Sequence, residues 1–334
     1  MGADQHFRDV SGTNARGDGT ADLTPFSSPW WLPGGHLQTI VPSLFAPPRV
    51  ALRRERWDTP DGDFIDVDFC GDPGAGQRLV LFHGLEGGSE SHYARSIAAH
   101  ALQHGWHLAI PHFRGCSGEL NRKPRAYHSG DSEEIDWVLR RLGATLHVIG
   151  FSLGGNAVLK WLGERGADAL ALVRRAAAVS APIDLSAAGN ALDRGLNRLV
   201  YTRHFLSTLK PKSLAKLEAF PGIYDAAKVR AARSFREFDG CVTAPLHGFR
   251  DTDHYWTSSS SGSYLQYIRV PTLLLNARND PFLPEQALLA AAQKAAPCVV
   301  LEFPRTGGHA GFVAGPFPGD HGWLPRRLFQ FLTT

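Results

Sequence analysis

Apolar runs alternate with stretches of helical periodicity between residues 77 and 182. The runs contain few alternating polar positions, which is typical of strands buried on both faces of a parallel sheet. They cover 77–84, 106–115, 145–151 and 173–182. The segments between them repeat apolar residues at helical spacing and cover 91–105, 129–143 and 152–166. This alternation predicts an α/β protein, with helices on both faces of a mostly parallel central sheet.

The pattern changes on both sides of this region. Residues 53–70 alternate polar and apolar positions around the turn Pro60-Asp61-Gly62, which predicts a pair of strands. Residues 183–268 hold mostly helical patterns. The α/β alternation then resumes with strands at 270–280 and 298–304 and helices at 283–296 and near 323–334. We therefore expect a core formed by residues 25–182 and 269–334, with residues 183–268 inserted as a helical cap.

The start of the chain differs from the rest. Residues 1–24 are polar and predict a tail that is disordered in solvent. The segment that follows is rich in aromatic residues, proline and glycine, and it includes the adjacent Trp30 and Trp31. Two tryptophans are costly to leave in water, so we expect both to pack on the main body. Insertion of this segment into lipid is the alternative.

Composition narrows the class of protein. The chain has 334 residues, of which 43% are hydrophobic and 20% charged, with a net charge of +3. This balance gives no argument for a nucleic-acid partner or an anionic membrane surface. The four cysteines form no CxxC pair and show no zinc-finger spacing, which favours reduced thiols in a cytoplasmic protein. No apolar run reaches membrane-spanning length, and the first residues lack the apolar core of a secretion signal.

The first candidate for chemistry is the sequence Gly150-Phe151-Ser152-Leu153-Gly154. It matches the G-x-S-x-G nucleophile elbow, in which a serine occupies a sharp turn from a strand into a helix. Small flanking residues are needed there because a side chain would collide with the neighbouring helix or strand. The match lies between a predicted strand and a predicted helix. We therefore interpret Ser152 as a nucleophile, against the alternative of a structural turn.

A serine nucleophile needs a base held by a third group, and in this type of fold the chain order is serine, acid, histidine. Asp280 follows one predicted strand, and His309 lies in a glycine-rich loop after the next strand. Both should therefore reach the same edge of the sheet as Ser152. The alternatives are a helix-cap or turn role for Asp280, with Asn279 as the nearest rival for the acid, and an ordinary loop histidine at position 309.

An oxyanion hole requires two backbone N–H donors directed at one point. Leu153 follows the nucleophile directly, and Leu85 lies in the loop after strand 77–84. Gly84, Gly87 and Gly88 would keep this loop close to the serine. Glu86 lies in the same loop, and we expect its carboxylate to be solvated or paired with an arginine.

Longer strings carry a family likeness. "PWWLPGGHLQTIVPSLF", "HGLEGGSES", "PHFRGCSGELNRKPRAYHSGDSEEIDWVL", "GFSLGGNAVLKWLGE", "VTAPLHGFRDTDHYW" and "LLLNARNDPFLP" together resemble the YheT-like branch of the α/β-hydrolases, which is related to ABHD-type lipid and ester hydrolases. The likeness runs from about Pro25 to the end of the chain. It implies a carboxylester hydrolase with a Ser–Asp–His triad, to which Ser152, Asp280 and His309 align, and it implies no metal or organic cofactor.

Two further polar groups have competing interpretations. Arg114 follows a predicted strand and could bind a substrate carboxylate or phosphate, but loop bracing by an acid such as Glu119 or Asp131 is favoured. The segment "HGFRDTDHYW", with two aspartates and two histidines, fits no zinc signature and is interpreted as a polar cap loop.

The sequence thus predicts a serine hydrolase that cleaves short- to medium-chain carboxylic esters through an acyl-enzyme. The partner is then a small-molecule or lipid-like ester, with no nucleic acid and no predicted membrane contact. The alternatives are an acyltransferase, a thioesterase, a lipid or phospholipid hydrolase with the same triad, or a binding protein that retains the fold without turnover. The oligomeric state is left open.

Overall fold

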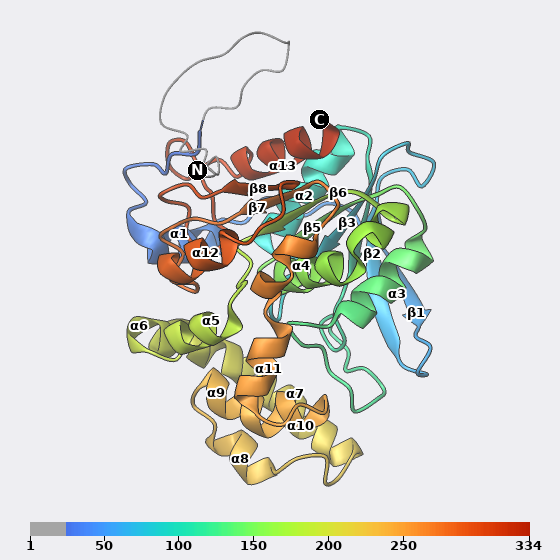
Figure 1. Ribbon diagram of the computed structural model, residues 1–334, viewed down its shortest axis with the longest axis vertical. Coiled ribbons are helices and arrows are strands. Elements are labelled where there is room, and N and C mark those ends of the chain that lie inside the picture. The colour runs from blue at the N-terminus through green and yellow to red at the C-terminus, as the bar shows by residue number, and fades with distance from the viewer. Residues whose placement is uncertain (1–24) are drawn as a thin grey trace, which may run out of the picture.

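The computed structural model describes residues 25–334 (Figure 1), so the expected tail at residues 1–24 lies outside the described part of the chain. Eight strands form one sheet in the order β1-β2-β4-β3-β5-β6-β7-β8. Strand β2 is antiparallel to both of its neighbours, and the remaining pairs are parallel. The strands are β1 (Arg53–Asp58), β2 (Phe64–Cys70), β3 (Arg78–Phe82), β4 (His107–Pro111), β5 (Leu146–Phe151), β6 (Val173–Val179), β7 (Thr272–Leu275) and β8 (Val299–Glu302).

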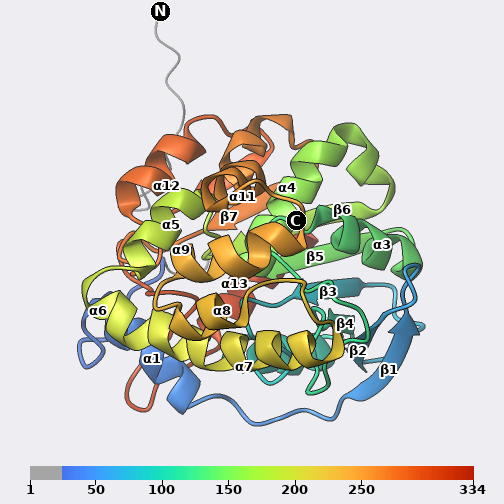
Figure 2. The ribbon, with the colours of Figure 1, turned by 90° about the horizontal axis from the view of Figure 1, so that it is seen from below.

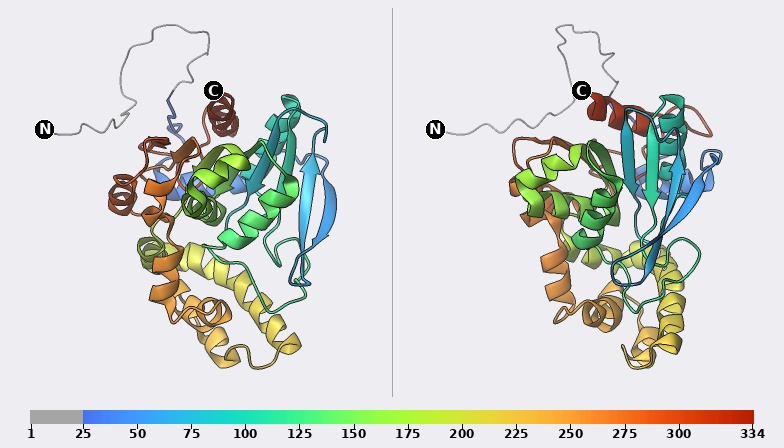
Figure 3. Two further views of the ribbon diagram at one scale, coloured as in Figure 1. Left: turned by 45° about the vertical axis from the view of Figure 1, so that its right-hand side comes forward. Right: turned by 90° about the vertical axis from the view of Figure 1, so that its right-hand side faces the viewer.

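Helices cover both faces of the sheet, as the alternating pattern predicts (Figure 3). One face packs against α3 (Ser132–Leu142), α4 (Leu153–Arg165) and α12 (Glu285–Ala292). The opposite face packs against α2 (His92–Gln103) and α13 (Trp323–Thr333). The helix expected at 283–296 is therefore present but shorter than its pattern suggested.

Most positions of the central strands are apolar because each face of the sheet meets its own core. In β3, Val80 and Phe82 belong to the core shared with α3 and α4, whereas Leu79 and Leu81 belong to the core shared with α2 and α13. Successive strand residues point to opposite faces, so a strand buried on both sides shows no polar alternation. Burial of each such side chain contributes roughly 1.5–3 kcal/mol.

The region between β6 and β7 is helical and forms the inserted cap. Figure 1 shows its helices gathered below the sheet, and Figure 2 shows them from below. They are α5 (Leu185–Leu192), α6 (Gly195–Asn197), α7 (Arg203–Ala219), α8 (Ala226–Ala231), α9 (Phe235–Phe238), α10 (Ala244–Leu246) and α11 (Thr252–Ser259). Short 3-10 or π turns also lie in this region, at η2 (Arg198–Thr202), η3 (Asp239–Thr243), η4 (Ser261–Ser263) and η5 (Leu265–Tyr267). A further 3-10 turn, η1 (Gly166–Ala171), lies outside the cap, between α4 and β6.

The aromatic segment near the start of the chain contains a helix that the sequence pattern did not predict, α1 (Gly34–Leu44). The expectation that both tryptophans pack on the body is wrong for Trp30, which is 91% exposed. Trp31 does pack: its indole N–H donates to the carbonyl of Gly315 at 3.1 Å, and its ring contacts Phe317 edge-on. The sequence pattern could not predict that Trp31 is packed and Trp30 exposed, because the difference depends on a contact between Trp31 and the distant loop at Gly315.

None of the helices in residues 25–334 combines the length and the apolar character needed to cross a lipid bilayer.

Candidate active site

Ser152 occupies a sharp turn between β5 and α4. Its backbone has φ 50° and ψ −119°, a region that non-glycine residues rarely adopt. A Cβ on Gly150 would lie 2.6 Å from the carbonyl oxygen of Gly154, and a Cβ on Gly154 would lie 2.5 Å from the carbonyl oxygens of Phe82 and His83. The turn is thus possible only because both flanking positions are glycine, which is the geometry expected of a nucleophile elbow.

The structure brings Ser152, His309 and Asp280 into one hydrogen-bonded chain. His309 Nε2 lies 2.9 Å from Ser152 Oγ, and His309 Nδ1 lies 2.9 Å from Asp280 Oδ2. Ser152 directly follows β5, whereas Asp280 and His309 follow β7 and β8 at the same carboxyl edge of the sheet. Asn279, the rival acid position, instead contacts Gln38 and the N–H of Gly308.

The environment of Asp280 selects the protonation pattern of the histidine. Asp280 Oδ1 accepts the N–H of Phe282 at 2.8 Å, which leaves Oδ2 for the imidazole. A carboxylate can only accept, so the proton of neutral His309 is assigned to Nδ1, and Nε2 is free to accept the serine hydroxyl proton. The ring of Phe282 stacks on the imidazole with a centroid distance of 4.0 Å and restrains its rotation.

The loop after β3 lies against the nucleophile. A Cβ on Gly84 would be 3.1 Å from Ser152 Cβ, so only glycine permits this approach without displacement. The neighbouring N–H groups are occupied: Gly84 donates to Tyr93 Oη at 2.9 Å, and Glu86 donates to Tyr127 Oη at 2.9 Å.

Two backbone N–H groups beside Ser152, those of Leu85 and Leu153, have no hydrogen-bond acceptor among the described residues. Within residues 25–334, the N–H of Leu85 meets no acceptor, although those of residues 84, 86, 87 and 88 all do. Leu153 is the first residue of α4, where the helix itself supplies no acceptor. These are the two groups that the sequence pattern assigned to an oxyanion hole.

Glu86 is neither solvated nor paired with an arginine, contrary to expectation. Its side chain is 8% exposed, and it pairs with Lys212 of α7 at 2.8 Å. The hydroxyl of Tyr127 also donates to Glu86 Oε1 at 2.9 Å. Glu86 therefore joins the loop after β3 to the cap, a contact that depends on a residue 126 positions away in the chain.

Arg114 braces loops, but not through the acids that the sequence suggested. Its guanidinium contacts Glu134 at 2.5 Å, Asp61 at 2.7 Å and Asp63 at 3.1 Å. The proposed partners pair elsewhere, with Glu119 contacting Arg56 and Asp131 contacting Arg125. Although Arg114 borders the cavity beside Ser152, three carboxylates already surround its charge. Supporting the loops is thus its visible role.

Helix α1 holds the loops of the acid and the histidine, a role that sequence reasoning missed. Gln38 is buried, and its Oε1 accepts the N–H of Gly307 at 2.8 Å and Nδ2 of Asn279 at 2.9 Å. Thr39 Oγ1 accepts the N–H of His309 at 2.9 Å. The available signal was the string "GGHLQT", which places His36, Gln38 and Thr39 within an otherwise apolar segment.

The close approach of α1 explains three glycines at this site. A Cβ on Gly35 would collide with the carbonyl of Asn279, and one on Gly311 would collide with the carbonyl of Gln38. Gly308 has φ 62°, and a Cβ there would lie 2.7 Å from the carbonyl carbon of Gln38. The backbones of α1 and of both loops are therefore in direct contact.

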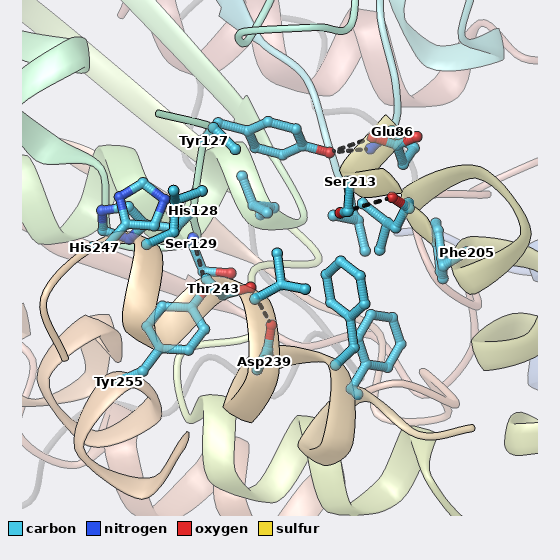
Figure 4. Close-up of a pocket in the computed structure, with 18 of the residues that line it drawn as sticks. Glu86, Tyr127, His128, Ser129, Phe205, Ser213, Asp239, Thr243, His247 and Tyr255 are labelled. Carbon is cyan, nitrogen blue, oxygen red and sulfur yellow. Dashed lines mark hydrogen bonds between the residues drawn. The ribbon is translucent and has the colours of Figure 1, made fainter. Parts of the chain in front are cut away.

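A cavity of about 150 Å³ opens beside Ser152 between the sheet edge and the cap. Its apolar lining comes mainly from cap residues Leu209, Phe205, Phe235, Phe238 and Val242. Figure 4 shows part of this lining, including Phe205. The polar part of the lining holds the charged side chains of Glu86, Arg114, Lys212 and Lys216 as well as two histidines. Burial lowers the pKa of His128 and of His247 to about 3 and raises that of Asp239 to about 6. Figure 4 also shows Asp239 accepting a hydrogen bond from Thr243, at 2.7 Å.

The segment "HGFRDTDHYW" is partly helical, contrary to its interpretation as a loop. Asp251 caps α11 by accepting the N–H of His254 at 2.7 Å. Among the described residues, no group of three or more His, Cys, Asp or Glu side chains is arranged to hold a metal ion.

The fold and the elbow define a class, and sequence comparison agrees. Residues 77–316 match the profile of the alpha/beta hydrolase fold family, so this chain is an α/β-hydrolase. Within the family it belongs to the YheT-like branch, which is related to the ABHD proteins. It is 38% identical to "Putative esterase YheT" of Escherichia coli (strain K12), over 90% of each chain. It is also 29% identical to "Phospholipase ABHD3" of Mus musculus, over 88% of this chain and 75% of that protein.

Solved structures show the same fold at low identity. An esterase from Exiguobacterium antarcticum superposes with a TM-score of 0.55 and 17% identity, over 84% of this chain and 99% of that one. A bacterial membrane phospholipase A superposes with a TM-score of 0.56 and 16% identity, over 90% of each chain.

Proposed function

We propose that this protein is a serine hydrolase that cleaves carboxylic esters, with Ser152 as nucleophile, His309 as general base and acid, and Asp280 as the group that orients the imidazole. The observation that carries the proposal is the pair of 2.9 Å contacts that join the three side chains at the carboxyl edge of the sheet. A serine is a weak nucleophile alone, and such a chain is what activates it.

In the first half of the reaction, Ser152 Oγ attacks the ester carbonyl carbon while its proton passes to His309 Nε2. The carbonyl oxygen becomes an oxyanion, which the N–H groups of Leu85 and Leu153 stabilise. Asp280 stabilises the imidazolium through Nδ1. The imidazolium then donates its proton to the departing alkoxide, which leaves as an alcohol, and the acyl group stays on Ser152.

In the second half, water replaces the alcohol. His309 removes a proton from water, and the resulting hydroxide oxygen attacks the acyl carbon. The tetrahedral intermediate collapses, His309 returns the proton to Ser152 Oγ, and the carboxylic acid is released.

The size and the lining of the cavity indicate which acyl groups it can accommodate. Its size and its aromatic and aliphatic lining favour short- to medium-chain acyl esters over bulky polar substrates. The names of the relatives favour a second candidate, a lipid ester: one is called a phospholipase, and a Saccharomyces cerevisiae relative with 26% identity is called "Monoacylglycerol lipase".

The test is hydrolysis of p-nitrophenyl esters from acetate to palmitate by the wild type, Ser152→Ala and the control Ser207→Ala, an exposed serine on α7. We expect the wild type and the control to hydrolyse the shorter esters and to be labelled by a fluorophosphonate probe, whereas folded Ser152→Ala does neither. Full activity in folded Ser152→Ala would refute the assignment. A preference for long chains would favour the lipid ester, and transfer of the acyl group to an added alcohol would indicate an acyltransferase.

A further inference from the structure

The modest net charge of the chain conceals a local concentration of positive charge in the cap. Residues 194–217 contain six arginines and lysines and no aspartate or glutamate. This segment spans α6, η2 and most of α7, and Figure 2 shows α6 and α7 in a row along one side of the cap. The first acidic residue after it is Glu218.

Helix α7 has two faces with different roles. Phe205, Leu209 and Lys212 point into the cavity beside Ser152. Arg203, Lys210 and other residues of the opposite face line a second, more open hollow of about 770 Å³, which α8 and η2 complete. The catalytic cavity and this outer hollow are thus separated by the thickness of one helix.

The cations around the outer hollow are not all remote from acids, because the charge of Arg198 acts on the nearby carboxylate of Asp193. These cations are Arg198, Arg203, Lys210, Arg230 and Arg233, which we call the basic rim. In the part of the chain that the structure describes, no member of the basic rim forms an ion pair. Arg198 and Lys210 donate to backbone carbonyls, at 3.3 Å to Arg233 and at 3.0 Å to Ala232. A group of cations without close ion pairs attracts anions.

Apolar side chains project from the same surface. Leu199 is 69% exposed and Leu196 is 53% exposed, and both lie within one turn of Arg198. Leu214 adds an apolar contact inside the hollow. Cations beside protruding leucines are typical of helical surfaces that lie on a bilayer, where the charges meet headgroups and the leucines enter the acyl boundary. A nucleic acid would use the cations but gain little from the leucines.

We propose that the basic rim, with Leu196 and Leu199, is a docking surface for bilayers that contain anionic phospholipids. Each arginine or lysine near such a surface strengthens binding by about fivefold, so five of them bind firmly at low salt and weakly at high salt. Docking would place the catalytic cavity one helix away from the lipid. The proposal concerns binding only and stands whether or not Ser152 is a nucleophile.

The experiment is co-sedimentation of the full chain with two kinds of vesicle. One contains phosphatidylcholine alone, and the other also contains about 30% phosphatidylserine, which gives the vesicle a negative surface charge. We expect binding only to the anionic vesicles, with loss of binding in high salt and no competition from inorganic phosphate. Arg198→Glu, Arg203→Glu should bind at least about 20-fold more weakly. Leu196→Ser, Leu199→Ser should bind more weakly without changing the salt dependence.

The matched control is Arg174→Glu, Arg269→Glu, which changes the net charge equally. Both residues are exposed and lie by the starts of β6 and β7, at the sheet edge opposite the cap. It should bind as the wild type does, and all variants should keep wild-type hydrolysis of p-nitrophenyl butyrate. Absence of wild-type binding to anionic vesicles would overturn the proposal, as would equal loss in the control. So would equally tight binding to a DNA duplex, which would indicate an electrostatic surface without lipid preference.

Discussion

Gln38 in α1 accepts a hydrogen bond from the N–H of Gly307, two residues before His309, at 2.8 Å. The same amide oxygen accepts the side chain of Asn279, next to Asp280. One buried side chain near the start of the chain thus bridges the two loops that carry the acid and the histidine, which makes Gln38 a positioning residue for the proposed triad.

Replacement of Gln38 should therefore harm catalysis more than binding. In Gln38→Ala, two buried donors lose their acceptor, which should cost about 2–4 kcal/mol of unfolding free energy. We expect kcat to fall at least about tenfold while KM stays within about twofold, because the loops shift but the cavity lining does not. Gln38→Glu, which keeps an acceptor oxygen, should recover part of kcat. Leu44→Ala, at an exposed position of the same helix, is the control, and equal kcat in all variants would contradict the role.

The elbow glycines should be intolerant of a side chain. Gly154→Ala places a Cβ 2.5 Å from the carbonyl oxygens of Phe82 and His83, and backbone atoms cannot move aside cheaply. We expect a loss of about 3 kcal/mol or more in urea unfolding, together with lost activity. Gly76→Ala is the matched control, because its Cβ would meet no atom within 4 Å and should change stability by less than about 0.5 kcal/mol. Equal stability of the two variants would show that the turn is not crowded.

The ion pair between Glu86 and Lys212 should couple the loop after β3 to the cap. Lys212→Met leaves a mostly buried carboxylate without its cation and should cost about 1–2 kcal/mol, since Lys212 itself is partly exposed. In the double variant Glu86→Gln, Lys212→Met, part of that loss should return. A double-mutant cycle should measure a coupling of at least about 0.5 kcal/mol, with Lys228→Met, an exposed lysine on α8, as the control. If the effects of the two single substitutions on the unfolding free energy were strictly additive, the ion pair would not couple the loop to the cap.

Acid should weaken the fold through Asp68. Burial opposes its ionisation, but hydrogen bonds from Arg54, His112 and Ser89 outweigh that effect and hold the pKa of Asp68 well below its usual range. Because the folded-state pKa is depressed, this stabilisation is present above about pH 4 and is lost as the pH falls from there toward the folded-state value. Ser89 belongs to the loop after β3, so we expect the loss also to loosen this loop.

The measurement is urea unfolding of the wild type and Asp68→Asn between pH 7 and pH 2. The variant should be less stable at pH 7, by on the order of 2 kcal/mol, and should lose less stability than the wild type on acidification. Asp253→Asn, at an exposed position, should follow the wild-type curve. Parallel curves for wild type and Asp68→Asn would show that other carboxylates control the acid response.

Much of the fold was predictable because its signals are local. Strands buried on both faces show largely apolar runs, and the motif around Ser152 can be read within five residues, although the contact that excludes a side chain at Gly154 comes from Phe82 and His83. The positions of Ser152, Asp280 and His309 after predicted parallel strands also predicted that they share one edge of the sheet, since parallel strands align their carboxyl ends. Helix α1 was missed because its glycines, Pro42 and aromatic neighbours obscure a helical pattern.

By itself, then, the sequence determined the α/β architecture, the helical insertion and the strand ends that carry the three candidate catalytic side chains, because each follows from periodicity or from the backbone freedom of glycine. Only the tertiary structure decided that Gln38 bridges the acid and histidine loops, that Arg114 contacts Asp61, Asp63 and Glu134, and that Glu86 pairs with Lys212. These contacts join residues that lie far apart in the sequence, and no local pattern encodes which distant partner the folded chain will bring within hydrogen-bonding distance.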